Sequence, residues 1–107
     1  MLQTKSFSAR DPEACETMAE VRAGVDEVDR DLIALLCRRF GYMDAAARIK
    51  PERGAVRDER RKAEVIANVR RHAVEAGLPE HALADLWDRL VEASIAYELE
   101  AFDRTAR

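Results

Sequence analysis

The most constraining feature of this sequence is an apolar stripe that continues, at steps of three and four residues, from about residue 14 to about residue 49. The spacing predicts one long amphipathic helix, which should end there because the residue before Pro51 resists the helical conformation. A helix of roughly 35 residues is about 52 Å long, whereas a compact chain of this size has a radius of gyration of about 13 Å. One chain cannot bury such a stripe, so we expect an obligate, intertwined homodimer. The stripe consists of Met18, Val21, Val25, Val28, Leu32, Leu35, Arg39, Tyr42, Ala46 and Ile49.

Two further helices are predicted after the first. Alternating Val, Ile and Thr are missing, and Ala, Leu, Glu and Arg dominate, so the composition favours helix throughout. The second helix should start with Asp58 as its N-cap and end at Gly77, with Pro79 just beyond. The fold class is therefore all-α, with three helices per chain. The second helix should bury Val65, Ile66, Val69 and Ala73, and the inner side of the third should carry Leu83, Leu86, Trp87, Leu90, Val91, Ile95 and Phe102.

Length and charge narrow the class of protein. The 107 residues, 48% of them hydrophobic and 36% charged, predict one folded domain over residues 14–105, preceded by an N-terminal tail over residues 1–13 whose order the pattern leaves open. A net charge of -3 argues against general nucleic-acid binding. No apolar run is long enough for a signal peptide or a membrane span, so we expect a cytoplasmic protein. Cys15 and Cys37 lack metal-ligand spacing and are expected to be reduced thiols, and no metal or cofactor is predicted.

Charged residues on the apolar stripes are the candidate site. Arg39 stands where the stripe calls for an apolar residue, and desolvating an unpaired ion costs several kcal/mol. Lys50 follows eleven residues later, within about 20° of the same helix face and roughly 16 Å further along the axis. On the third helix Ser94 and Glu98 are four residues apart and share an apolar face. Arg22 is turned by about 100° from Arg39 and about 25 Å away, so it could serve only the partner's pocket.

A structural interpretation of the same residues stays open. Arg39 could pair with an internal acid such as Asp85 or Glu92, because buried arginines are usually paired. Glu98 could lie at the rim of the dimer interface. The other cations, Lys50, Arg61 and Arg22, are singly most typical of solvated surface residues. His72 and His81 have no partner spacing and receive no role.

The segments "VRAGVDEVDRDLIALLCRRFGYMDAAARIK", "VRDERR" and "LVEASIAYE" together resemble the all-helical chorismate mutase family, which includes isochorismate-pyruvate lyase relatives. The resemblance covers about residues 15 to 104 and implies an intertwined helical dimer with two active sites. It further implies that Arg22 grips a substrate carboxylate in the other subunit's site, and that Arg39 grips one within its own chain. Lys50 matches the lysine that contacts the ether oxygen, and Glu98 would face that oxygen from the opposite side.

The remaining matched positions complete the implied site. Arg61 matches the arginine near the substrate carboxylate, with Arg60 as the alternative because the preceding loop is one residue shorter than in some members. Asp58 matches the acid that helps to position the ring hydroxyl, and Ser94 matches the serine of the last helix. The implied function is chorismate mutase, the pericyclic rearrangement of chorismate to prephenate in phenylalanine and tyrosine biosynthesis.

Two departures from the family pattern keep other functions open. Many mutases have an acid, which contacts the ring hydroxyl, where this sequence has Lys62. Glu98 stands where many members use Gln, and it would help only when protonated, because an ionised carboxylate would repel the ether oxygen. The alternatives are an isochorismate-pyruvate lyase that forms salicylate and a non-catalytic helical dimer module.

Overall fold

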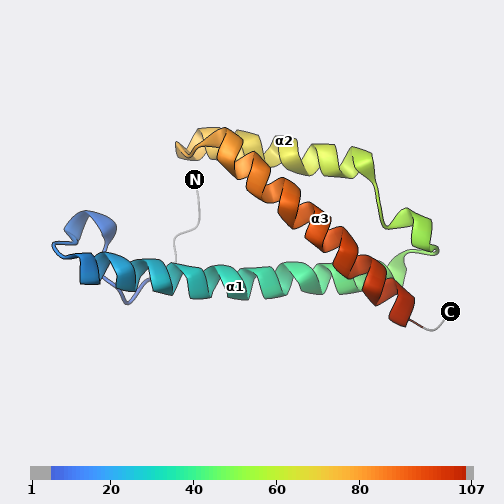
Figure 1. Cartoon of the computed structure of the whole chain (residues 1–107), viewed down its shortest axis with the longest axis horizontal. Helices are drawn as coiled ribbons and strands as arrows, with labels where there is room; N and C mark the ends of the chain where they lie inside the picture. Colours follow the sequence, from blue (N-terminus) through green and yellow to red (C-terminus); the bar gives the residue numbers. More distant parts are fainter. Residues whose placement is uncertain (1–5, 106–107) are drawn as a thin grey trace. The chain divides into compact units, whose positions relative to one another are not determined.

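The computed structural model describes residues 6–105 and shows three α-helices and no strand within them. A 3-10 turn, η1 (Pro12–Ala14), precedes α1 (Met18–Ile49); η2 (Arg53–Ala55), α2 (Glu59–Ala76) and α3 (Glu80–Arg104) follow (Figure 1). The prediction of an all-α fold with three helices and a long first helix is confirmed. The chain divides into two compact units, of which one ends at Arg39 and the other begins at Phe40, and each is described by itself.

The first helix starts at Met18, so the predicted start near residue 14 is wrong. The reason is a reciprocal capping box, in which the Thr17 hydroxyl accepts a hydrogen bond from the Glu20 N–H at 3.2 Å. Glu20 Oε1 in turn accepts one from the Thr17 N–H at 3.0 Å. This pattern satisfies two backbone donors at the helix start and fixes it there.

The chain before α1 makes contacts with that helix. Of the predicted tail, residues 1–5 lie outside the described residues. Ser8 and Ala9 donate backbone hydrogen bonds to the Glu27 carboxylate, each at 3.0 Å. Arg10 pairs with Glu20 at 2.6 Å. The segment therefore lies along the first turns of α1.

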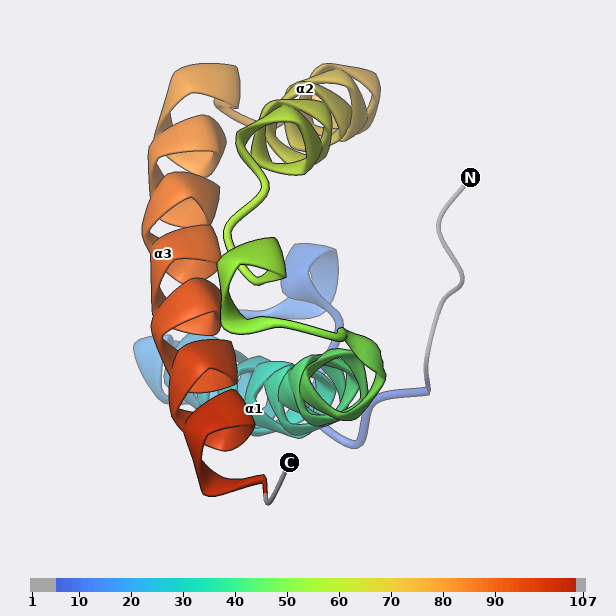
Figure 2. The same cartoon turned by 90° about the vertical axis from the view of Figure 1, so that its right-hand side faces the viewer.

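The second helix has the ends that the sequence predicts. Asp58 caps its start by accepting a hydrogen bond from the Arg61 N–H at 3.0 Å. Gly77 ends it with φ 74°, in the left-handed region that favours glycine, and the Leu78 N–H bonds back to the Ala73 carbonyl at 2.8 Å. This tight turn leads directly into α3, so α2 folds back beside the first half of α3 (Figure 2).

Among residues 6–105, the buried side chains are small apolar ones and two polar ones. In the second unit the buried apolar residues are Ala47, Val56, Ala73, Ala84, Val91 and Ala101. Ser94 and Glu98 are buried with them. Leu86, predicted on the inner side of α3, is 58% exposed, so that expectation is wrong for the single chain.

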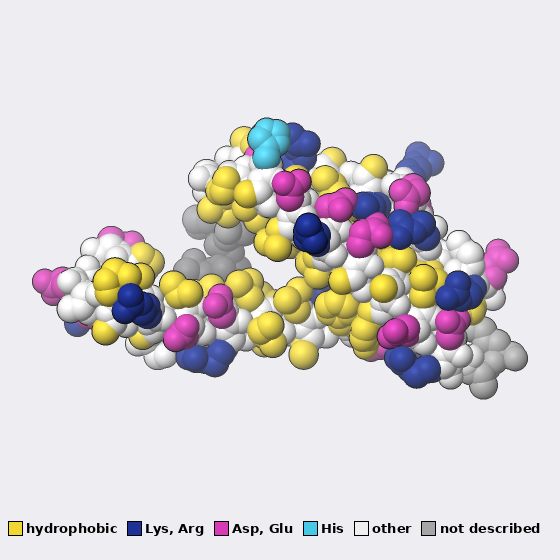
Figure 3. All heavy atoms as spheres, in the orientation of Figure 1, with side chains coloured by type: hydrophobic (Ala, Val, Ile, Leu, Met, Phe, Trp, Pro, Cys, Tyr) yellow, Lys and Arg dark blue, Asp and Glu magenta, His cyan; other side chains and the backbone are white. Residues whose placement is uncertain are grey.

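Large apolar side chains of α1 stay uncovered. Leu35 is 63% exposed and Leu32 50% exposed, and hydrophobic side chains line the visible face of the helix (Figure 3). Such a continuous apolar surface is typical of an interaction site. Among the described residues no helix is both long and apolar enough to cross a membrane.

Candidate active site

A buried ion pair between Lys50 and Glu98 is the centre of the candidate site. Lys50 Nζ donates to Glu98 Oε2 at 2.7 Å and to the Val56 carbonyl at 3.4 Å. Glu98 is 4% exposed, whereas the Lys50 side chain is 29% exposed. A cation and a carboxylate from residues 48 positions apart are thus held together, with the cation closer to solvent.

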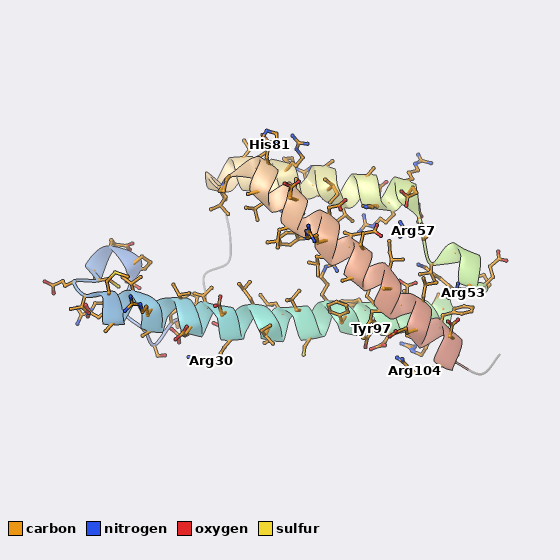
Figure 4. The ribbon with its side chains drawn as sticks, viewed as in Figure 1. Arg30, Arg53, Arg57, His81, Tyr97 and Arg104 are labelled. Atoms are coloured by element: carbon orange, nitrogen blue, oxygen red, sulfur yellow. The ribbon has the colours of Figure 1, made fainter. Side chains whose placement is uncertain are left out.

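Contacts before and after Lys50 in the sequence hold α3 against the end of α1 and against η2. Tyr97 lies where α3 crosses the end of α1, and its hydroxyl donates to Asp44 at 3.0 Å (Figure 4). Its ring meets the Phe40 ring edge to face, with centroids 4.9 Å apart. Arg53 of η2 binds both oxygens of Asp103 at 2.9 and 3.2 Å. These contacts fix the chain on both sides of Lys50.

Ser94 lies one helical turn before Glu98 and is buried, with 3% of its surface exposed. Its hydroxyl donates to the Leu90 carbonyl at 2.7 Å, the i−4 bond typical of serine within a helix. Because that bond uses the hydroxyl proton, the oxygen of Ser94 can serve a ligand as an acceptor.

A cluster of ion pairs joins α2 to α3. The Glu92 carboxylate accepts hydrogen bonds from Nη2 and Nη1 of Arg57, at 2.7 and 3.1 Å, and from Lys62 Nζ at 2.8 Å. Lys62 also contacts Asp88 at 2.9 Å, and Arg57 contacts Glu59 at 2.7 Å. Lys62, which departs from the family pattern, therefore has a structural role as a tie between the two helices.

The cluster shifts the ionisation of its members. Hydrogen bonds from Arg57, and then from Lys62, lower the pKa of Glu92 from 4.5 to about 2. Hydrogen bonds to Glu92 and then to Asp88 raise the pKa of Lys62. Both shifts favour the charged forms of Glu92 and Lys62, so the ion pairs of the cluster stabilise each other's charges.

Four other residues were predicted for the site, two at the start of α2 and two on α1. Asp58 uses its carboxylate to cap α2, and the exposed Arg61 side chain pairs with Glu64 at 3.2 Å. Arg22 is exposed and Arg39 is half-buried, and both belong to the unit that ends at Arg39. The described structure therefore pairs Lys50 with Glu98 one helical turn from Ser94, and the catalytic and binding roles of all seven residues stay predictions.

Several residues that build the site were not singled out from the sequence. Tyr97, Asp44 and the Arg53–Asp103 pair are contacts between distant segments, for which no local pattern exists. Glu92 was considered only as a structural partner for Arg39. Among the described residues, no group of three or more His, Cys, Asp or Glu side chains could hold a metal ion.

Comparison with known proteins identifies the family. Residues 21–99 match the model of the family described as chorismate mutase type II. The chain belongs to this family. The matched range includes Lys50, Ser94 and Glu98, as well as Arg22 and Arg39.

A curated relative of this chorismate mutase type II chain is the isochorismate pyruvate lyase of Pseudomonas aeruginosa. The two are 30% identical over 94 residues, which cover 88% of this chain and 93% of that protein. The family and this relative confirm the resemblance seen in the sequence.

The Glu92 cluster predicts a decline of stability in acid. The pKa of Glu92 is lower in the folded chain than its ordinary value, so its stabilising effect is fully present above about pH 4.5 and is lost as the pH falls towards about 2. Glu92→Gln should therefore flatten the dependence of unfolding free energy on pH in this window, measured by urea unfolding. Glu100→Gln, at an exposed position on the same helix, is the control. An equal slope for wild type and Glu92→Gln would contradict the assignment.

Proposed function

We propose that the protein is a chorismate mutase, which converts chorismate to prephenate by an intramolecular rearrangement. The buried Lys50–Glu98 pair, in a chain of the chorismate mutase type II family, is the observation that carries this proposal. The product would supply phenylalanine and tyrosine biosynthesis, a cytoplasmic route.

The reaction needs positioning and electrostatics from the protein. One C–O bond breaks and one C–C bond forms within a single molecule, so neither a nucleophile nor a proton transfer is required. The enzyme has to select the compact conformer and stabilise negative charge that develops on the ether oxygen. Arg39 and the partner's Arg22 clamp the two carboxylates, since a planar guanidinium binds a carboxylate through two hydrogen bonds.

The Lys50–Glu98 distance sets what substrate binding must do. At 2.7 Å the two groups bond to each other and leave no space for an oxygen between them. An ether oxygen that accepts from both sides needs two hydrogen bonds of about 2.8 Å each, so the groups must separate to roughly 5 Å. Lys50 is the more exposed partner and has a flexible stem, so it is the group that moves.

Glu98 is the acceptor of the Lys50 ammonium in the free chain, and in the substrate complex it takes part as a donor after it has taken up a proton. A protonated carboxyl can donate to the ether oxygen, whereas an ionised one would repel the charge that grows there. The Lys50 ammonium supplies the positive charge in either case.

The exposed stripe of α1 supports the homodimer. Leu32, Leu35 and Met18 are each at least half exposed in the single chain, and a second copy that covers them would bury a continuous apolar surface. In such a dimer Arg22, exposed on α1, serves the site of the partner.

Isochorismate pyruvate lyase is the second candidate. The relative from Pseudomonas aeruginosa carries this name and matches most of the chain. Elimination of pyruvate from isochorismate follows a related pericyclic path and uses the same charges. The tie of Lys62 to Asp88 and Glu92 also favours it, because no acid at this position reads the ring hydroxyl.

An assay with both substrates tests the proposal. We expect the purified protein to form prephenate from chorismate more efficiently than salicylate from isochorismate, and Lys50→Ala to lower kcat by about 10²–10³-fold. Arg48→Ala, at an exposed position two residues earlier, is the matched control. Salicylate as the main product would establish the lyase instead. Product from neither substrate would favour a non-catalytic dimer module.

Substitution of Glu98 tests the requirement for a donor. Glu98→Gln keeps a neutral donor of the same shape and should retain kcat at pH 7 at or above the wild-type value. Glu98→Leu removes the donor and should lower kcat by about 10²–10³-fold, measured by loss of chorismate. Equal loss in both variants would show that Glu98 acts through its negative charge.

Mixed dimers test the shared site. Arg22→Ala and Lys50→Ala protomers should each be nearly inactive alone. After joint unfolding and refolding, heterodimers should contain one site with both defects and one intact site, so activity should return to about a quarter of the wild-type value, since half of the dimers are mixed. The absence of recovery would argue that Arg22 acts within its own chain.

A further inference from the structure

The segment before α1 is fastened to the helix by Glu27. This carboxylate accepts three hydrogen bonds: from the backbone N–H groups of Ser8 and Ala9, at 3.0 Å each, and from the Ser8 hydroxyl at 2.5 Å. Charge-assisted bonds of this kind are stronger than neutral ones. Glu27 therefore holds the far end of the segment against the third turn of α1.

The near end of the segment is fastened by Glu20. Besides its bond to Thr17 in the capping box, Glu20 accepts from the Glu16 N–H at 2.8 Å and pairs with Arg10 at 2.6 Å. The hydrogen bond from the Glu16 backbone is the main cause that lowers the pKa of Glu20. Both ends of the segment are thus fastened to carboxyl groups of α1.

The apolar side chains between the segment and the helix leave a hollow. A hollow of about 490 Å³ lies between the segment and α1, and Phe7 and Pro12 line it together with Val21, Val25 and Val28 of the helix. Phe7 remains 43% exposed. The two carboxylates supply the charged, directional hydrogen bonds between the segment and the helix.

The attachment leaves Arg22 unobstructed. Glu20 and Glu27 are seven residues apart, so they lie within about 20° of each other on one face of α1, whereas Arg22 points about 160° away from Glu20. Helix ends fray unless they are tied down. A clamp on the first three turns from the opposite side steadies the backbone of Arg22 without covering its side chain.

We propose that residues 8–17 form a clamp that positions Arg22 for the active site of the partner subunit, with Glu20 and Glu27 as its positioning residues. The role of Arg22 rests on the proposed function. The clamp itself is a property of the single chain, and the two can be tested separately.

Amide hydrogen exchange tests the clamp without any substrate. Glu27→Ala removes the three hydrogen bonds and replaces Glu with a good helix former, so α1 itself should persist. We expect exchange at residues 18–24 to become about tenfold faster in this variant. Glu13→Ala removes an exposed acid of the segment and should leave exchange unchanged. Equal exchange in Glu27→Ala and wild type would overturn the clamp.

A double-mutant cycle tests the connection to Arg22. Glu27→Ala should lower kcat/KM for chorismate, or for isochorismate if that is the substrate, by about threefold to tenfold, mainly through KM. In the Arg22→Ala background the same change should alter kcat/KM by less than twofold, because the group that it positions is gone. Additive effects would overturn the positioning role and leave only general destabilisation. If the wild type converts neither substrate while exchange still accelerates, the clamp exists but its assignment to catalysis is rejected together with the proposed function.

Discussion

The burial of Glu98 is the constraint on which the second unit depends. An uncompensated carboxylate at 4% exposure would cost several kcal/mol, so a cation has to reach it. Lys50, at the end of α1, supplies that cation, and the same ammonium also contacts the Val56 carbonyl beyond η2. The end of α1, the loop after it and the second half of α3 must therefore converge at this point. The fully buried apolar residues of this unit are small, so the polar contact is set in a core without large buried side chains.

The cations between residues 46 and 65 differ in the acids with which they pair. Arg53, Arg57 and Lys62 bind acids of α3, and Arg61 binds Glu64 on its own helix. These pairs are largely solvent-exposed and each adds little stability, but several of them together fix how the loop and α2 meet α3. Lys50 differs because its partner is buried. A ligand that draws Lys50 away therefore has to offset the cost of leaving the buried Glu98 carboxylate without its cation.

Much of the fold could be predicted from the sequence because helix periodicity and caps are local signals. Asp58 and Gly77 mark the ends of α2 as expected. The start of α1 was predicted wrongly although its signal, Thr17 with Glu20 three residues later, is also local. Other features could not be predicted. The role of Lys62 depends on partners in α3, which lie far from it in the sequence. Leu86 follows the apolar period of α3 but stays exposed in a single chain, because periodicity identifies a helix face and not the element that covers it.

The choice between mutase and lyase likewise depends on contacts that no local pattern in the sequence specifies. Both reactions act on a dicarboxylate and develop charge at the same ether oxygen, so the residues that bind these groups cannot separate them. Discrimination must come from groups near the ring hydroxyl, where the two substrates differ. Lys62 is already engaged by Asp88 and Glu92. At the start of α2, Glu59 pairs with Arg57, and one oxygen of Asp58 caps the helix. Under the proposed function Asp58 is the candidate for this discrimination, and the ties between α2 and α3 fix the helix start that carries it.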